Sequence, residues 1–213
     1  MAKTVVLDVD GTLMDTNYLH TEAWARAFED VGHRVPRVEL HHQIGKSSEL
    51  LVREFVDDDE TVEKIQALHA EYFARFQEHG HALPGAKELL SKLADAGHPV
   101  WLATSANDEE LEHHMDQLEA GGKVAGVVNP SAVESGKPAP DIFEEALRRA
   151  GAPADDTVAV GDAIWDVESA KRAGIRTVAV LSGGAFSPQE LKEAGAAEVH
   201  KDCAALIRAG FPE

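Results

Sequence analysis

The sequence predicts an α/β protein with a Rossmann-like core, in which helices cover both faces of a parallel sheet. A second, all-helical part is inserted into this core. Two observations support the prediction. Short apolar runs rich in β-branched residues alternate with stretches of helical periodicity, as in parallel sheets. The alternation is interrupted once, between Asp15 and about Leu83, where helical patterns recur without a convincing strand.

Five apolar runs are predicted to be strands. Each is almost continuously apolar, which is typical of parallel strands that are buried on both faces. They are residues 4–7, 99–103, 124–128, 157–160 and 176–181. Apolar stripes between them recur at helical spacing and end at Gly97, Gly151 and Gly174, and glycine commonly ends a helix.

The helical segment is predicted to be a separate cap domain at residues 15–83, and the core is predicted to comprise residues 1–14 and 84–213. Leu19, Ala23, Ala27 and Val31 form its first apolar stripe, and the α/β pattern resumes at Pro84. The acidic run at residues 57–60 is expected to be a loop and helix start, where acids favour the helix dipole.

The charge excludes some classes of partner. The 213 residues include 20 basic and 38 acidic residues, giving a net charge of −18. Such a surface disfavours nucleic acid and anionic membranes. The single cysteine, Cys203, cannot form an intrachain disulfide and is expected to pack. No signal peptide or transmembrane run is recognised, so a cytoplasmic protein is expected. The sequence does not give the oligomeric state, and a monomer or a weak dimer both fit it.

Polar side chains follow four of the predicted strands or the loops after them. Ligands of open parallel sheets bind beyond the carboxyl ends of the strands, so we expect these side chains to share one site. They are Asp8 and Asp10, Thr104 and Ser105, Lys137, and Asp162 and Asp166.

The chemistry of these residues favours phosphoryl transfer. Asp8 and Asp10 are two residues apart on a strand end and therefore face the same side. Several carboxylates at one edge would repel one another without a cation, and oxygen ligands alone select Mg²⁺. A carboxylate held beside Mg²⁺ can attack phosphorus, while Thr104, the Ser105 amide and Lys137 can donate to the phosphate oxygens.

Four ordered motifs resemble those of the haloacid dehalogenase superfamily across essentially the whole chain. They are DVDGTL, TS, SGKPAPDIF and GDAIWD, beginning at residues 8, 104, 135 and 161. The helical insertion resembles the C1 cap of the branch that contains β-phosphoglucomutase and phosphoglycolate phosphatase. Together, in order, the motifs are far more specific than any one of them.

The resemblance implies roles for the core residues. Asp8 would be the nucleophile that forms an aspartyl-phosphate. Asp10 would be the general acid and then the base, and its backbone carbonyl would bind Mg²⁺. Thr104 and Lys137 would hold the phosphoryl group. The implied metal set is Asp8, Asp10, Asp162 and Asp166, the last directly or through water or Lys137. The amides of Val9, Gly11 and Ser105 would contact phosphate.

The resemblance also points to residues of the cap. His20 would serve as a hinge or substrate contact, and the stretch IGKSSEL at residues 44–50 resembles a substrate-specificity loop. In that loop Gly45 would turn the chain, Lys46 would face the core site, and Ser47 would cap the next helix. The histidine pairs at residues 41–42 and 113–114 are expected on the surface or in a groove.

The function predicted from these motifs is a Mg²⁺-dependent phosphatase acting on a small phosphorylated metabolite. A sugar phosphomutase and a catalytically silent binding protein are the alternatives. Similar mutases carry a cap arginine just after the loop glycine, where this chain has Ser47 and Ser48, and Arg53 is distant. Dehalogenation is disfavoured by the acid at Asp10, and phosphonate cleavage is disfavoured because Asp10 is not replaced.

Overall fold

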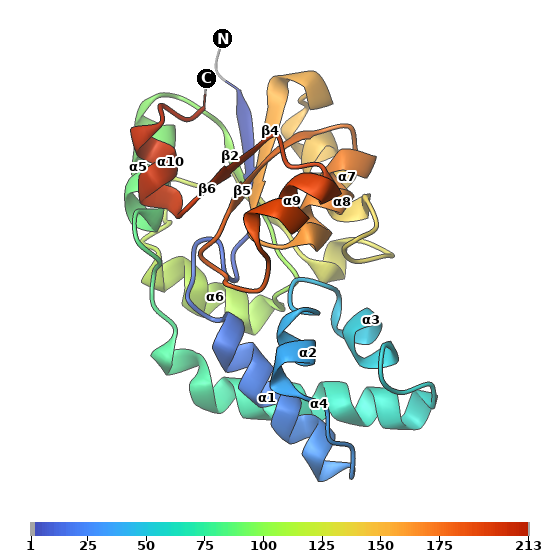
Figure 1. Cartoon of the computed structure of the whole chain (residues 1–213). Coiled ribbons are helices and arrows are strands. Elements are labelled where there is room, and N and C mark those ends of the chain that lie inside the picture. The colour runs from blue at the N-terminus through green and yellow to red at the C-terminus, as the bar shows by residue number, and fades with distance from the viewer. Residues whose placement is uncertain (1–2, 213) are drawn as a thin grey trace.

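The computed structural model describes residues 3–212 and contains a six-stranded, all-parallel sheet (Figure 1). The strand order is β3-β2-β1-β4-β5-β6. The strands are β1 (Thr4–Leu7), β2 (Val100–Ala103), β3 (Gly126–Val128), β4 (Thr157–Gly161), β5 (Arg176–Val180) and β6 (Glu198–His200).

The first strand lies at the centre of the sheet. Val5 of β1 is in register with Val100 of β2 on one side and with Val158 of β4 on the other. All four residues of β1 are buried. The chain adds strands on one side of β1 as far as β3, and on its other side from β4 onward. Ligands of doubly wound sheets bind at such a switch point, beyond the carboxyl ends of the strands.

Helices cover both faces of the sheet, and alternate strand residues face each layer. One layer packs against Val5 and Leu7, and the opposite layer packs against Val6. The first layer contains α5 (Ala86–Asp95), α6 (Asp108–Gln117) and α10 (Cys203–Arg208). The second contains α7 (Asp141–Ala150), α8 (Ile164–Arg172) and α9 (Pro188–Ala194). Cys203 is buried, as expected.

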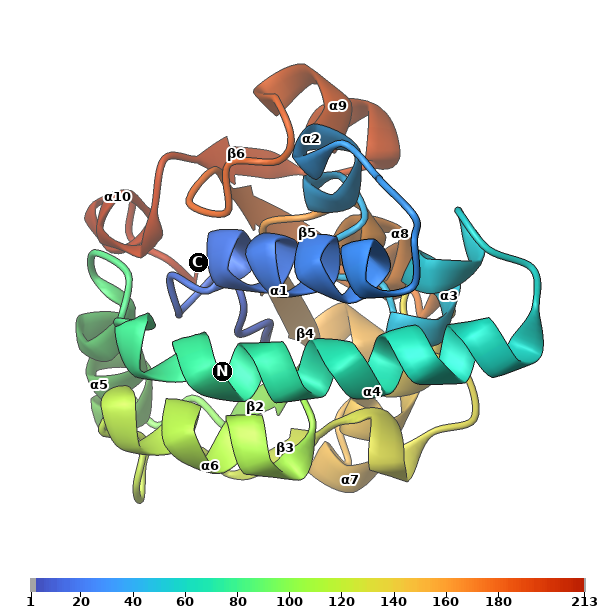
Figure 2. The same cartoon turned by 90° about the horizontal axis from the view of Figure 1, so that it is seen from below.

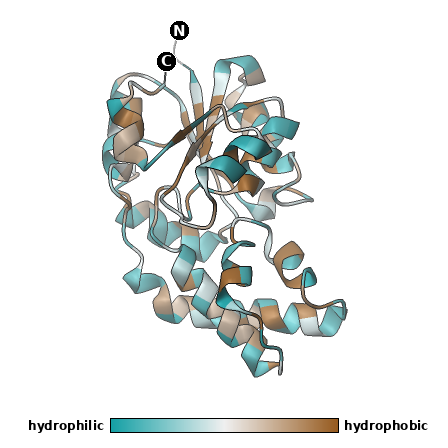
Figure 3. Ribbon diagram, viewed as in Figure 1, coloured by the Kyte–Doolittle hydropathy of each residue, from teal (hydrophilic) through white to brown (hydrophobic). Residues whose placement is uncertain are grey.

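Four helices follow β1 and lie beyond the carboxyl ends of the strands (Figure 1). They are α1 (Asn17–Asp30), α2 (Arg37–His41), α3 (Ser48–Arg53) and α4 (Asp59–Phe76). Seen from below, α1 and α4 run side by side (Figure 2). This helical insertion has an apolar cluster of its own, which includes Trp24, Phe28 and Ile65. Hydrophilic and hydrophobic residues alternate along its long helices (Figure 3).

The chain enters and leaves the helical insertion through two adjacent segments. The backbone N–H of Asp15 donates to the carbonyl of His81 at 2.8 Å, and that of Leu83 donates to the carbonyl of Leu13 at 2.8 Å. The two connections are therefore hydrogen-bonded to each other where they leave the core. This geometry suits a hinge, although the division into two domains that move separately stays a prediction.

The predicted parallel fold is confirmed, with local differences. The short strand β6 was missed, because its three residues form an edge and are exposed or half-buried. Leu19 and Val31 are only half-buried, since Trp24 and Phe28 supply much of the buried face of α1. Asp58 caps α4 by accepting from the Thr61 amide, as the acidic run predicts.

No helix within residues 3–212 is both long enough and apolar enough to cross a membrane.

Gly85 marks the return to the core and provides a test of its packing. Its φ is +85°, and an added Cβ would lie 2.3 Å from the backbone nitrogen of Ala204. Gly97 has a similar φ of +76° but open space around it. We expect Gly85→Ala to lower the free energy of unfolding by at least about 2 kcal/mol and Gly97→Ala by about 1 kcal/mol. Chemical denaturation measures both, and equal losses would contradict the proposed close packing.

Candidate active site

The site lies where the carboxyl ends of the central strands meet the helical insertion. Asp8 follows β1, Thr104 follows β2 and Asp162 follows β4, while Lys137 comes from the loop before α7. A cavity of about 240 Å³ opens beside them, and both the core and the insertion contribute to its walls. The predicted meeting of polar side chains at one edge of the sheet is thus present in the structure.

Lys137 is the cation at the centre of this edge. Its side chain is fully buried, and its Nζ lies 2.6 Å from Asp8 Oδ1 and 2.7 Å from Asp166 Oδ1. It also donates to the backbone carbonyl of Ala103 at 2.8 Å. A buried ammonium needs such compensation. Lys137 consequently fixes the side chain of Asp8 relative to the end of β2.

Asp162 is held by two residues that sequence reasoning did not single out. Thr12 donates to Asp162 Oδ1 at 3.1 Å, and Asn17 donates to Asp162 Oδ2 at 3.0 Å. Asn17 is the first residue of α1, so the insertion contacts this carboxylate directly. A Cβ at Gly11 would lie 2.3 Å from Asn17 Nδ2. The glycine of the first motif is therefore required for this close approach.

The acidic side chains fit a Mg²⁺ ion. Asp8, Asp162 and Asp166 are buried, and each offers a carboxylate oxygen within 4.8 Å of the others. Lys137 supplies one positive charge against these three carboxylates. Hard oxygen donors without nitrogen or sulphur favour Mg²⁺ over transition metals. The donor set therefore supports a divalent cation at this position.

The electrostatics of the metal-free cluster point the same way. Burial, together with the charge of Asp166, raises the pKa of Asp8 to about 7, although Lys137 opposes the rise. Burial and the charges of Asp166 and Asp8 also raise the pKa of Asp162 well above its usual range. Burial would lower the pKa of Lys137, but Asp166 and Asp8 outweigh it, and the pKa is raised. A divalent cation would relieve the repulsion that these shifts express.

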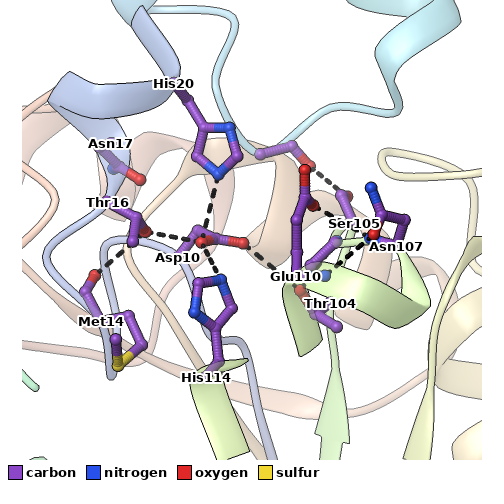
Figure 4. Close-up of polar contacts among 12 residues, drawn as sticks. Asp10, Met14, Thr16, Asn17, His20, Thr104, Ser105, Asn107, Glu110 and His114 are labelled. Atoms are coloured by element: carbon purple, nitrogen blue, oxygen red, sulfur yellow. Dashed lines mark hydrogen bonds and ion pairs between the residues drawn. The ribbon is translucent and has the colours of Figure 1, made fainter. Parts of the chain in front are cut away.

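Asp10 lies in a different environment, shown in Figure 4. Its Oδ1 accepts from the Thr16 hydroxyl at 2.6 Å and lies 3.4 Å from His20 Nε2 and 3.3 Å from His114 Nε2. Its Oδ2 lies 3.5 Å from the Thr104 hydroxyl. Burial would raise the pKa of Asp10, but its contacts with His114 and His20 outweigh burial and hold the pKa well below its usual range.

His114 corrects the expectation for the second histidine pair. It was predicted to lie on the surface or in a groove, yet it is fully buried on α6 and contacts Asp10. Burial lowers its pKa, but Asp10 outweighs that effect and the pKa is raised. Leu111, Met115 and Leu118 recur at helical spacing, and His114 lies on the same face of the helix, so the periodicity could have indicated its inward position. His41 is also buried and lies 3.0 Å from the Gly183 carbonyl.

The groups predicted to contact phosphate differ in the hydrogen-bond partners that they already have. Thr104 is buried and its hydroxyl accepts from the Ala106 amide at 3.0 Å. The Ser105 hydroxyl donates to the Gly45 carbonyl at 3.1 Å, so this side chain joins the core to the insertion. The Gly11 amide donates to the Met14 carbonyl at 2.8 Å, so it already has one hydrogen-bond partner. The amides of Val9, Gly11 and Ser105 stay predicted contacts.

The predicted residues of the insertion reach the cavity, with one difference. His20, Gly45 and Lys46 all line it. Gly45 turns the chain with φ +98°, as predicted. Lys46 does not present a free ammonium, because its Nζ lies 2.8 Å from Glu54 Oε1. Ser47 precedes α3 as predicted, but its side chain makes no capping hydrogen bond.

Comparisons with known proteins agree with this fold and site. The sequence model of the hydrolases described as haloacid dehalogenase-like matches residues 2–174. The protein CbbY (plasmid) of Cupriavidus necator is 30% identical over 88% of this chain and 81% of its own length. The phosphoglycolate phosphatase of Pseudomonas fluorescens is 28% identical over 97% of this chain and 79% of its own.

Solved structures are similar over nearly the whole chain. A hydrolase from Pseudomonas syringae has a TM-score of 0.92 and 34% identity and covers 97% of both chains. CbbY from Rhodobacter sphaeroides, solved with xylulose-1,5-bisphosphate, has a TM-score of 0.82 and 24% identity over 97% of this chain and 96% of its own, and shows the fold alone. The chain belongs to the haloacid dehalogenase-like hydrolases, and the prediction of a phosphoric monoester hydrolase of this superfamily is confirmed.

The raised carboxylate pKa values predict how Mg²⁺ should stabilise the protein. A pKa of about 7 for Asp8, against an ordinary 3.8, means that the metal-free fold loses stability as pH rises between these values. Mg²⁺ binds the deprotonated acids and should offset that loss. We expect the Mg²⁺-induced rise in Tm to be larger at pH 8 than at pH 5.5. Asp8→Asn should reduce this difference, and an equal Mg²⁺ effect at both pH values would contradict the assignment.

The contact with Asp10 predicts a role for His114. Its substitution by glutamine removes the imidazole that holds the Asp10 carboxylate, and acid–base catalysis is sensitive to such positioning. We expect His114→Gln to lower kcat by at least about tenfold, a fraction of a typical acid–base contribution. His113→Gln, at the half-buried neighbouring position, is the matched control and should change kcat less than about twofold. Equal effects in steady-state kinetics would contradict the role.

Proposed function

We propose that this chain is a Mg²⁺-dependent phosphatase that hydrolyses a small phosphorylated metabolite through an aspartyl-phosphate on Asp8. The observation that carries the proposal is the buried arrangement of Asp8, Lys137, Asp162 and Asp166 at the edge of a cavity that could hold a substrate. The phosphatases among the similar proteins support the reaction class. The proposed location is the cytoplasm.

In the first step a carboxylate oxygen of Asp8 forms a bond to phosphorus, and the bond from phosphorus to the leaving oxygen breaks. Lys137 lies 2.6 Å from Asp8 Oδ1 and orients the nucleophile. Lys137 and Thr104 would also donate to the phosphoryl oxygens as charge develops on them. Asp10 would deliver the proton that the leaving oxygen requires, so that the product departs as a neutral alcohol.

In the second step Asp10 takes a proton from water, whose oxygen attacks the phosphorus, and Asp8 is released. The lowered pKa of Asp10 keeps this carboxylate deprotonated, which is the form that accepts a proton, and its two histidine partners hold it in position. Its role as acid requires a proton, which His114, whose pKa is raised, can hold beside it. Bound at Asp8, Asp162 and the Asp10 carbonyl, with Asp166 directly or through water, Mg²⁺ would neutralise charge on the nucleophile and the phosphoryl group.

The helical insertion would control access to this chemistry. Thr16 and Asn17, at its start, contact Asp10 and Asp162 respectively, and Ser105 of the core contacts Gly45 of the insertion. Opening at the paired connections would break these contacts together. Closure would therefore couple the position of the cap to the position of the catalytic carboxylates and would exclude water in the first step.

A sugar phosphomutase is the second candidate, because it would use the same aspartyl-phosphate. The structure favours it less. The cap arginine of similar mutases has no counterpart beside Gly45, and Arg53 is held on the exposed face by Glu49 at 2.8 Å and Asp59 at 2.7 Å. Arg53 is therefore not placed to return the phosphoryl group to a substrate.

The assignment of the nucleophile gives a direct test with a generic ester, p-nitrophenyl phosphate, and Mg²⁺. Asp8→Asn replaces the attacking oxygen and should lower kcat by at least about 10³-fold, as loss of a covalent nucleophile does. Circular dichroism should show that the fold persists. A well-folded Asp8→Asn variant with near-normal turnover would contradict the mechanism, and a wild-type protein without turnover would favour the silent binding protein.

A further inference from the structure

We propose that the preferred substrate is the phosphate monoester of a small, uncharged, hydroxyl-bearing compound rather than one with a carboxylate or a second phosphate. This inference rests on the proposed phosphatase function and concerns the leaving group alone. It follows from the side chains that surround the cavity beyond the nucleophile.

The charged groups at the cavity are mostly acids. Asp8 and Asp10 face it from the sheet edge, and Glu110 faces it from α6. Bound Mg²⁺ and Lys137 would compensate the acids at the phosphoryl position, where Lys137 pairs with Asp8 and Asp166. Among the described residues, by contrast, the Glu110 carboxylate accepts only from the Asn107 backbone amide, at 3.1 Å. A second anion on the substrate would approach this carboxyl group. Like charges brought together in a partly enclosed site weaken binding.

Of the described residues that line the cavity, one is a lysine and none is an arginine. The ammonium of that lysine already contacts other side chains. Lys46 Nζ lies 2.8 Å from Glu54 Oε1 and 4.2 Å from the centroid of the Trp165 ring. An ion pair and a cation–π contact hold the ammonium away from the leaving group. A carboxylate or phosphate bound in the cavity would have to compete with Glu54 for this ammonium.

The histidines of the lining do not replace this cation. His20 contacts Asp10 through Nε2 at 3.4 Å and His69 through Nδ1 at 3.2 Å, so both ring nitrogens face protein groups. His69 is buried and stacks on Trp24 with ring centroids 3.7 Å apart. A buried, stacked imidazole adjoining another histidine is poorly placed to carry a positive charge.

Neutral hydrogen-bonding groups in the lining suit hydroxyls instead. Gln66 on α4 and Ser48 on α3 are half-buried, and no hydrogen bond of their side chains exists within residues 3–212. Asn107 uses Oδ1 to cap α6 and keeps its amide N–H groups for other acceptors. Amides and hydroxyls both donate and accept, which matches the two roles of a substrate hydroxyl.

The size and remaining walls of the cavity restrict the leaving group further. Its volume is about 240 Å³, below the roughly 300–1,000 Å³ of common drug-sized sites. Trp24, Ile44 and Leu51 add apolar surface from the insertion. A short polyol or a single sugar has both the hydroxyls and the carbon–hydrogen surface for these walls. A nucleotide or lipid tail exceeds this space.

Matched pairs of substrates test the inference. 2-Hydroxyethyl phosphate and 2-phosphoglycolate differ at the terminal carbon, as do glycerol 3-phosphate and 3-phosphoglycerate. With Mg²⁺, we expect kcat/KM to be at least about tenfold higher for the neutral member of each pair. p-Nitrophenyl phosphate, assayed in parallel, reports the phosphatase reaction itself.

The ion pair between Lys46 and Glu54 provides a second test. A variant that breaks this pair should improve turnover of an anionic ester. Glu54→Gln frees the ammonium without removing it and should raise kcat/KM for 2-phosphoglycolate at least about threefold. Turnover of 2-hydroxyethyl phosphate should stay within about twofold. Glu49→Gln is the matched control on α3, because Glu49 pairs with Arg53, which does not line the cavity. It should change neither substrate.

The outcomes separate the two proposals. Hydrolysis of p-nitrophenyl phosphate with an equal or higher kcat/KM for the anionic esters would overturn the inference and leave the phosphatase assignment standing. Failure to hydrolyse any ester would overturn the phosphatase assignment, and this inference with it. If Glu54→Gln matched Glu49→Gln on 2-phosphoglycolate, the role given to the tethered Lys46 would be wrong.

Discussion

The contact between Lys137 and two buried carboxylates determines the arrangement of this site. The ammonium lies between Asp8 and Asp166 and reaches the end of β2 through the Ala103 carbonyl. Without it, the carboxylates at this edge would face one another with little compensation from the protein. The single ammonium of Lys137 does not balance three carboxylates, so negative charge remains in excess once Asp162 is included. A divalent cation bound here would offset this excess charge, and it would lie beside Asp8, the proposed nucleophile.

The helical insertion is joined to the same cluster by a few polar contacts. Asn17 binds the Asp162 carboxylate, and Thr16 and His20 contact Asp10. These residues lie at the start of the insertion or within α1, whereas its apolar core lies farther along the helices. In the proposed mechanism, the insertion would keep its own packing while its contacts with Asp10 and Asp162 form or break. This connection would link the position of the insertion to the geometry of the two carboxylates.

Much of the fold and the core site could be predicted because the signals are local. Buried parallel strands are apolar runs, and Asp8, Asp10, Thr104 and Asp162 follow such runs directly. The short edge strand β6 lacks that signal. Lys137 could be located through its motif, but its two ion pairs depend on how three loops converge. Local sequence patterns therefore predict which residues lie at the edge of the sheet. Their contact partners are known only from the tertiary structure.

Several residues that contact the predicted site residues were not identified from the sequence, for the same reason. Thr12 and Asn17 resemble ordinary turn and helix-start residues in the sequence, yet both bind Asp162. His114 lies on the same helical face as Leu111 and Leu118, but periodicity does not identify Asp10 as its partner. Lys46 was expected to face the core, but its ammonium forms an ion pair with Glu54, eight residues later. Such contacts join segments whose proximity no periodicity encodes.

The central claim is that Asp8 carries the phosphoryl group during turnover. The most direct measurement is rapid acid quenching of the protein during hydrolysis of a ³²P-labelled ester, followed by borohydride reduction and peptide mass spectrometry. Reduction converts an aspartyl-phosphate to homoserine. The account predicts homoserine at Asp8 in the tryptic peptide from Thr4 to Arg26, and unmodified aspartate at Asp10. Modification at Asp10 or another residue, or none at Asp8 while the enzyme turns over, would contradict it.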